Sequence, residues 1–263
     1  AEFHIDTTKK LMVVDDHPVN LLFMMKVLKK LGFTHVDEAR SGKEALVLFE
    51  QRDYDLIFMD CQMPEMDGFE ASTRIREMED FANQTKIIAV TADAMKGARE
   101  KCIDAGMNDY ISKPVDIEKL KAVLSDWLMG DGSGQQSAQT APVIAIAAAA
   151  EESEELKIMD WDRLRLFTDG DPEEERNLIA MFMSYAQESL TILQEEVGKD
   201  DSEPWKKAAH KLKGSAANLG AMALSEKCYV AEKDYQNPSA EKETMLQEIL
   251  TAYRNLSDAL NKE

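Results

Sequence analysis

The chain has few cysteines, fewer basic than acidic residues, and no long apolar run. Its only cysteines are Cys61, Cys102 and Cys228, too few and too widely spaced for a disulfide framework or a structural metal site. Basic residues number 31 against 50 acidic ones, a net charge of −19, so we expect no direct binding of nucleic acid. No stretch approaches the roughly 20 apolar residues of a membrane span. We expect no membrane insertion and a cytoplasmic, reducing location.

The sequence also lacks an initiator Met and an apolar leader segment, since it starts Ala1-Glu2-Phe3-His4. We therefore expect a piece of a longer chain. Hydrophobic residues make up 44% of the sequence and charged residues 31%, which is typical of a folded globular protein rather than a disordered one.

Residues 8–129 alternate short apolar runs with amphipathic stretches. Strands are predicted over 11–14, 35–39, 55–59, 86–90 and 109–112, and helices near 18–31, 42–51, 68–79, 93–104 and 116–128. Continuous apolar runs indicate strands that are buried on both faces of a parallel sheet. The predicted fold of this part is a five-stranded, parallel, doubly wound α/β domain.

After residue 129 the pattern changes to helices only. Residues 130–155 are rich in Gly, Ser, Gln and Ala, the composition of a flexible linker. Within 156–263 we predict a short helix near 160–167 and long helices near 172–198, 203–218, 221–235 and 239–261. Four long amphipathic helices in about 100 residues indicate an antiparallel four-helix bundle. We thus expect an α/β domain followed by an all-α domain.

Charged and hydroxyl side chains stand at the carboxyl ends of the predicted strands, where an open parallel sheet has its functional crevice. They are Asp15, Asp16, Asp60, Thr91 and Lys113. Clustered carboxylates repel one another and favour a shared cation, and all-oxygen ligands suit Mg²⁺. A carboxylate can accept a phosphoryl group when a metal, a lysine and a hydroxyl stabilise the transferred oxygens. The set therefore predicts a Mg²⁺-dependent phosphoryl-acceptor site.

Four blocks of this first domain resemble the signature of response-regulator receiver domains, which have a flavodoxin-like fold. The blocks are 13–16 (VVDD), 59–68 (MDCQMPEMDG), 91–92 (TA) and 112–114 (SKP). The resemblance implies that Asp60 is the phosphoacceptor. It implies Mg²⁺ ligands at Asp15, Asp16, Asp60 and the backbone carbonyl of Gln62, with Asp16 and Asp60 in direct contact.

The same resemblance assigns the remaining roles in the domain. Lys113 pairs with the phosphoryl group. When Asp60 is phosphorylated, Thr91 moves towards the phosphoryl group and Tyr110 changes its rotamer. The peptide bond between Lys113 and Pro114 is expected to be cis. Gln62 and Asp93 occupy the positions that tune the lifetime of the acyl phosphate in this family. Both residues also fit a solvated loop, so the sequence does not predict that lifetime.

His210 is the one histidine inside the predicted bundle. The apolar stripe of its helix comprises Trp205, Ala209, Leu212, Ala216 and Leu219. At 100° per residue, His210 lies about 150° from the centre of this stripe, so we expect it to face solvent. Lysines and small residues surround it, which suits a phosphoryl carrier. An incidental surface histidine would show the same pattern.

Residues 210–216 (HKLKGSA) and 219–221 (LGA) resemble the core motif of histidine-containing phosphotransfer (Hpt) domains. The resemblance implies that His210 carries the phosphoryl group, supported by Lys211, Lys213 and Gly214.

Together the two resemblances imply a two-component phosphorelay. Asp60 would accept phosphate from the phosphohistidine of an upstream histidine kinase, and His210 would pass it to, or receive it from, a downstream receiver. This domain order suggests the C-terminal part of a hybrid sensor histidine kinase. The chain has no P-loop or kinase glycine-rich motif, so we expect no ATP-dependent kinase activity from it.

Three alternatives stay open at this point. The chain could be a free-standing relay protein, or a scaffold whose domains do not exchange phosphate. It could also be a Mg²⁺-dependent hydrolase with an Asp nucleophile, although Cys61 and Gln62 follow Asp60 where such enzymes have a D-x-D pattern.

Overall fold

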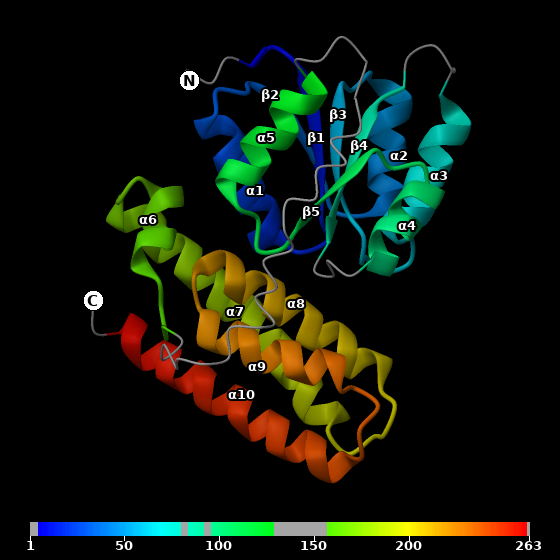
Figure 1. The fold of residues 1–263 in the computed structure, drawn as a ribbon. Coiled ribbons are helices and arrows are strands. Elements are labelled where there is room, and N and C mark those ends of the chain that lie inside the picture. Colours follow the sequence, from blue (N-terminus) through cyan, green and yellow to red (C-terminus); the bar gives the residue numbers. More distant parts are fainter. Residues whose placement is uncertain (1–4, 80–83, 92–95, 129–156, 262–263) are drawn as a thin grey trace.

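A computed structural model describes residues 5–79, 84–91, 96–128 and 157–261 (Figure 1). A unit with a central sheet comes first, and a unit made of helices follows. The predicted linker over 130–155 lies outside the described residues. Among the described helices, none combines the length and the apolar character that crossing a membrane requires.

The sheet has five parallel strands in the order β2-β1-β3-β4-β5. Their bounds are β1 Lys10–Val14, β2 His35–Ala39, β3 Leu56–Asp60, β4 Lys86–Thr91 and β5 Asp109–Ser112. Every residue of the central strand β3 is buried, whereas the edge strand β2 is largely accessible. This order is the flavodoxin-like one, which confirms the predicted fold of the first unit.

Helices cover both faces of the sheet. They are α1 Pro18–Lys30, α2 Gly42–Gln51, α3 Gly68–Met78, α4 Lys96–Asp104 and α5 Ile117–Leu128. Side chains alternate along a strand, so Leu11 and Val13 of β1 pack with α1 and α5, while Met12 and Val14 pack with α2, α3 and α4. Figure 1 shows the two groups of helices on opposite sides of the sheet.

The second unit is a bundle of long helices preceded by a short one. The helices are α6 Trp161–Thr168, α7 Pro172–Glu196, α8 Glu203–Leu219, α9 Met222–Lys233 and α10 Ser239–Leu260. The sequence determines where two of these helices start. The Asp171 carboxylate accepts hydrogen bonds from the first backbone amides of α7, and the Ser202 hydroxyl accepts one from the backbone N–H of Trp205 in α8. The predicted bundle is confirmed, with helix ends within two residues of the expected positions.

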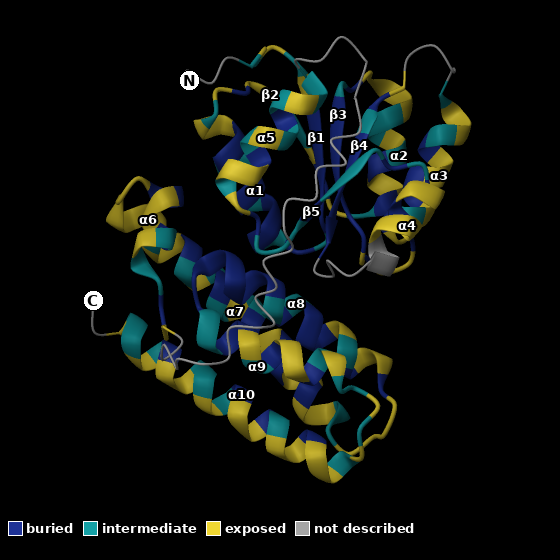
Figure 2. Ribbon diagram, viewed as in Figure 1, coloured by how far each residue is buried: buried dark blue, intermediate teal, exposed yellow. Residues whose placement is uncertain are grey.

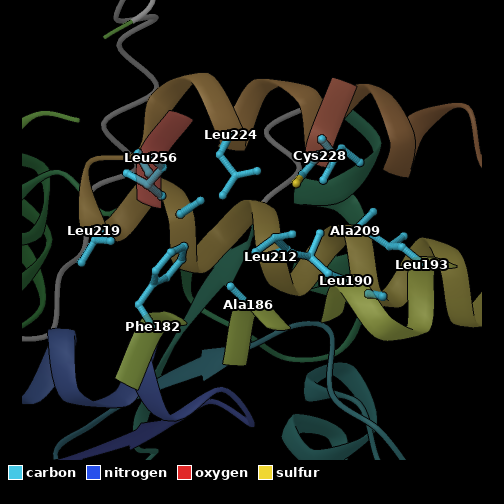
Figure 3. Packing of buried hydrophobic residues seen from close by; sticks show 14 of the residues in the cluster. Phe182, Ala186, Leu190, Leu193, Ala209, Leu212, Leu219, Leu224, Cys228 and Leu256 are labelled. Atoms are coloured by element: carbon cyan, nitrogen blue, oxygen red, sulfur yellow. The ribbon is translucent and has the colours of Figure 1, made fainter. Parts of the chain in front are cut away.

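The apolar stripe predicted for α8 lies inside the bundle. Trp205, Leu212 and Leu219 of this stripe are at most 1% exposed. Figure 3 shows Leu212 and Ala209 of α8 between Leu190 on α7 and Cys228 on α9. Helix α8 therefore packs between α7 and α9.

The bundle contacts the first helix of the sheet unit. Helix α1 packs against α6, α7 and α8, and Figure 1 shows the bundle lying below the lower end of α1. Val19 of α1 is part of the apolar core of the bundle, and Phe167 of α6 is part of the core of the sheet unit. Buried residues continue across this boundary in Figure 2. The two units are docked on one another.

Candidate functional site

The predicted acidic residues meet at one edge of the sheet. Asp15 and Asp16 follow β1, and Asp60 is the last residue of β3. One carboxylate oxygen from each lies within 4.8 Å of the other two. Gly68 lets this edge form, because a Cβ there would lie 2.1 Å from the backbone oxygen of Asp60. The sequence pattern MDG at 66–68 thus starts α3 directly against the end of β3.

Lys113 joins two of the three carboxylates. Its Nζ lies 2.8 Å from Asp15 Oδ2 and 3.0 Å from Asp60 Oδ1, and its side chain is 4% exposed. Burial by itself lowers the pKa of Lys113, but the two carboxylates outweigh burial and raise this pKa above its ordinary value. Lys113 is therefore a permanent positive charge beside Asp60. The peptide bond between Lys113 and Pro114 is cis, as the family resemblance implied.

Asp60 is a buried carboxyl group in a field of mixed charges. Burial raises the pKa of Asp60 to about 7, opposed by Lys113 and reinforced by Asp15 and Asp16. The backbone N–H of Gln62 lies 3.4 Å from Asp60 Oδ1, while the Gln62 side chain is exposed. A cation at this edge would favour the ionised form of Asp60.

The donor set fits Mg²⁺. It consists of carboxylate oxygens from Asp15, Asp16 and Asp60, all within reach of one ion, and hard oxygen ligands are those that Mg²⁺ prefers. Among the described residues of the sheet unit, Lys113 pairs with two of these three acidic groups. A divalent cation would add further positive charge at the same edge.

The other predicted residues of this unit lie around the same edge. Thr91 is buried at the end of β4, and its carbonyl accepts a 2.6 Å hydrogen bond from the backbone N–H of Lys113. Tyr110 of β5 is half-buried against the core under α2, α3 and α4. Asp93 lies outside the described residues.

His17 also lies at this edge, although only its place after the acidic pair distinguishes it in the sequence. Its backbone N–H donates to Asp15 Oδ1 at 2.8 Å, and its ring lies 5.2 Å from the ring of Tyr185 on α7. Burial lowers the pKa of His17 to about 4, although Asp15 and Asp16 oppose the shift. The ring is thus neutral at neutral pH and forms part of the contact between the units.

His210 is buried, which corrects the expectation that it faces solvent. The residue is 7% exposed. It does lie off the apolar stripe, but Glu232 of α9 contacts its ring, and its neighbours Lys211 and Gly214 lie against the edge of the sheet unit. Lys113, which contacts Asp60, is close enough to lower the pKa of His210. The periodicity of α8 predicts which face is buried inside the bundle. It does not indicate that a second unit packs against the opposite face of the helix.

Glu232 is a residue beside His210 that sequence reasoning missed. Its carboxylate lies 2.8 Å from Nδ1 of His210 and also pairs with Lys213. Burial lowers the pKa of His210 and Glu232 opposes that shift, while Lys113 and Lys213 add to it. Because a carboxylate only accepts hydrogen bonds, Nδ1 carries the proton, and Nε2 keeps its lone pair.

The neighbours of His210 contact different partners. Lys213 pairs with Glu232 rather than with the sheet unit, whereas Lys211 pairs with Asp16. A Cβ at Gly214 would lie 3.9 Å from both Asn20 Nδ2 and Lys113 Cδ. This is ordinary contact, so Gly214 marks the approach of the two units without requiring the absence of a side chain.

Comparison with known proteins gives two family matches. Residues 11–125 match the model of the response regulator receiver domain, and residues 177–261 match that of the Hpt domain. The signal transduction histidine-protein kinase BarA of Escherichia coli is 30% identical over 258 residues, covering 95% of this chain and 27% of BarA. The sensor histidine kinase GacS of Pseudomonas protegens is 26% identical over 244 residues, 91% of this chain and 26% of GacS.

Solved structures are similar to part of the chain. The receiver domain of the sensor histidine kinase PA1611 from Pseudomonas aeruginosa, with a magnesium ion in its active-site cleft, is 36% identical, with a TM-score of 0.43 over 47% of this chain and 99% of that one. A chain of the Saccharomyces cerevisiae complex between Ypd1 and the Ssk1 receiver domain is 28% identical, with a TM-score of 0.44 over 46% and 90%. The chain spans about a quarter of the length of its curated relatives BarA and GacS.

Proposed function

Residues 11–125 belong to the response regulator receiver domains and residues 177–261 to the Hpt domains of two-component signalling, and from this membership we propose that the chain passes a phosphoryl group between Asp60 and His210. Residues 8–129 form the receiver unit, 130–155 the connection, and 156–263 the Hpt unit. The phosphoryl group comes from the phosphohistidine of an upstream histidine kinase. It leaves His210 for an Asp of a downstream receiver, or returns by the same route.

The observation that carries this proposal is the placement of α8 over the acidic edge. Lys211, next to His210, pairs with Asp16. Gly214, one turn further, lies against the Lys113 side chain, whose Nζ contacts Asp60. The acceptor and the carrier therefore belong to one continuous contact between the units, and transfer within one chain needs no second copy.

At Asp60 the chain supplies a nucleophile and a charge partner. In its ionised form, Asp60 attacks the incoming phosphorus, and a P–O bond forms as the P–N bond to the donor histidine breaks. Lys113 holds a positive charge next to the oxygens of the transferred group. Mg²⁺, held by Asp15, Asp16 and Asp60, would supply further positive charge to the same oxygens.

At His210 the chain supplies a ring nitrogen of defined protonation. Glu232 keeps the proton on Nδ1, so the Nε2 lone pair attacks phosphorus as the P–O bond to Asp60 breaks. The ring then carries a positive charge, because Nδ1 has kept its proton. The Glu232 carboxylate stabilises that charge, and Lys213 holds Glu232 in place.

Site mapping with radiolabelled acetyl phosphate and Mg²⁺ tests the proposal. Wild type is expected to carry acid-labile, base-stable label on His210. Asp60→Asn is expected to carry none, and His210→Gln is expected to accumulate base-labile label on Asp60. The exposed residues Asp53 and His35 provide matched controls: Asp53→Asn and His35→Gln should label as wild type does.

A dilution series separates transfer within a chain from transfer between chains. Labelling of His210 in wild type is expected to have a rate that does not depend on protein concentration. A mixture of Asp60→Asn and His210→Gln chains should label His210 only at a rate that rises with concentration. If wild type labels Asp60 and never His210, the units do not exchange phosphate, and the chain is a docking scaffold.

A further inference from the structure

Lys211 of the Hpt unit occupies the acidic edge of the receiver unit. Its Nζ forms an ion pair with Asp16 Oδ2. The Asp16 side chain is 7% exposed and that of Lys211 is 37% exposed. The buried member of the pair is thus the carboxylate, and the lysine reaches it from outside. Asp16 lies in a receiver motif and Lys211 in the Hpt motif, and neither motif by itself predicts a contact between them.

With this ion pair, each of the three carboxylates has a lysine as its partner. Lys113 contacts Asp15 and Asp60, which leaves Asp16 without a cation from its own unit among the described residues. Lys211 provides that cation. A buried carboxylate without a positive partner is costly, and in the docked arrangement Lys211 is the positive partner of Asp16.

We propose that Lys211 competes with Mg²⁺ for Asp16, so that the docked Hpt unit lowers the affinity of the receiver unit for the metal. This inference rests on the metal site in the proposed function. A divalent cation and an ammonium group cannot both contact one carboxylate oxygen closely without strong repulsion. Mg²⁺ bound through Asp16 Oδ2 therefore requires Lys211 to leave that oxygen.

The competition is reciprocal. Any factor by which the Lys211 contact weakens Mg²⁺ binding is also the factor by which Mg²⁺ weakens that contact. Lys211 follows His210 directly in the chain, so the metal at the receiver site alters the surroundings of the carrier histidine. The metal-free chain keeps its acidic edge covered, and Mg²⁺ releases one of the contacts that cover it.

The test is the metal affinity of the full chain. Free Mn²⁺ is counted by its electron paramagnetic resonance signal, and Mg²⁺ is then added in competition. The neutral variant Lys211→Met keeps the length of the side chain, and Lys211→Arg keeps its charge. The control is Lys207→Met, which removes the same charge one turn earlier on α8 at an exposed position. Asp16→Asn identifies binding at the acidic edge.

Lys211→Met is expected to bind Mn²⁺ and Mg²⁺ about three- to tenfold more tightly than wild type at low salt. Lys211→Arg and Lys207→Met should stay within about twofold of wild type, and Asp16→Asn should bind weakly in every background. The difference between wild type and Lys211→Met should shrink as NaCl is raised towards about 1 M, because salt screens a half-exposed ion pair.

Three results overturn the inference, and those that leave the metal site intact are distinguishable from the one that does not. If wild type and Lys211→Met bind the metal equally well, Lys211 does not compete with it at Asp16. The same follows if metal affinity rises equally in Lys211→Met and Lys207→Met. Both results leave the metal site of the proposed function intact. Absence of metal binding in wild type and in both neutral variants removes the competition together with the metal site of the proposed function.

Discussion

The side-chain amide of Asn218 on α8 donates a 2.9 Å hydrogen bond to the amide oxygen of Asn20 on α1, 198 residues earlier in the chain. Asn20 in turn donates through Nδ2 to both carboxylate oxygens of Asp15, at 3.2 Å each. One buried side chain therefore connects the Hpt helix to the acidic edge of the receiver. Loss of the Asn218 donor leaves a buried oxygen of Asn20 unpaired, which costs about 1–3 kcal/mol.

Replacing Asn218 by Asp is expected to weaken the docked state. A carboxylate cannot donate to Asn20, and it adds a negative charge near Asp15. Hydrogen–deuterium exchange in α1 should rise about tenfold or more, which corresponds to the lost bond. The control is Asn255→Asp, the same change at an exposed position of α10. Unchanged exchange in α1 of Asn218→Asp would show that this bond does not hold the units together.

Phe167→Ala should separate the units without unfolding either. The Phe167 ring is 5% exposed and lies 4.1 Å, between centroids, from the ring of Phe23 on α1. Removal of a buried aromatic side chain costs about 3 kcal/mol, and here the loss falls on the contact between the units. Small-angle scattering should report a larger radius of gyration. Leu166→Ala, at a neighbouring side chain that is 51% exposed, should scatter as wild type does.

Glu232→Gln should slow phosphorylation of His210 by about tenfold. The amide can still accept a hydrogen bond from Nδ1, but it cannot offset the positive charge that the ring gains during transfer. The rate of His210 labelling from phosphorylated Asp60 measures the effect. Glu226→Gln removes a carboxylate from an exposed position of the same helix and should leave the rate unchanged. Equal rates in the two variants would exclude an electrostatic role for Glu232.

The pH dependence of stability should report the burial of His210. Burial lowers its pKa below the ordinary value of 6.5, so the unfolded chain takes up a proton there at a higher pH than the folded chain. The stability that His210 contributes is full above about pH 6.5 and is lost as the pH falls through the folded-state pKa. Relative to His210→Gln, wild type should therefore lose unfolding free energy below about pH 6.5 in urea titrations. A constant difference down to about pH 5 would contradict the burial.

Two glycine substitutions should behave oppositely. A Cβ at Gly68 would lie 2.1 Å from the backbone oxygen of Asp60, whereas a Cβ at Gly214 would meet its neighbours at 3.9 Å. Gly68→Ala should lower the free energy of unfolding of the receiver unit by about 2 kcal/mol or more, because backbone must move. Gly214→Ala should be neutral or slightly stabilising, since Ala favours a helix over Gly. Thermal unfolding of the two variants provides the comparison.

The residues that end the strands could be predicted because their positions follow from local patterns. Short apolar runs place Asp60 and Lys113 at the same edge of a parallel sheet, and the structure joins them by a 3.0 Å ion pair. The positions of the five strands along the chain and the starts of α7 and α8 also follow from runs, caps and prolines close in sequence. Each of these features depends on residues within one turn or one strand.

The surroundings of His210 could not be predicted in this way. Glu232 reaches it from the next helix, and which acidic residue does so depends on how α8 and α9 cross. Lys211 and Lys213 are two residues apart and appeared equivalent, yet one contacts Asp16 and the other Glu232. Their difference arises from the docking of one unit on the other. A helical wheel of α8 contains neither α9 nor the receiver unit.

Val19 and Phe167 extend in opposite directions across the contact between the units. Each side chain completes the apolar interior of the other unit, so separation would leave two uncovered apolar spots. A free receiver whose first helix presents a similar apolar residue would cover Phe167 as Val19 and Phe23 leave. In the proposed relay, release of phosphate from the chain would then be an exchange of one receiver for another, with little net change in buried apolar area. The output would depend on the concentration of the free receiver, which would compete with the receiver in the same chain.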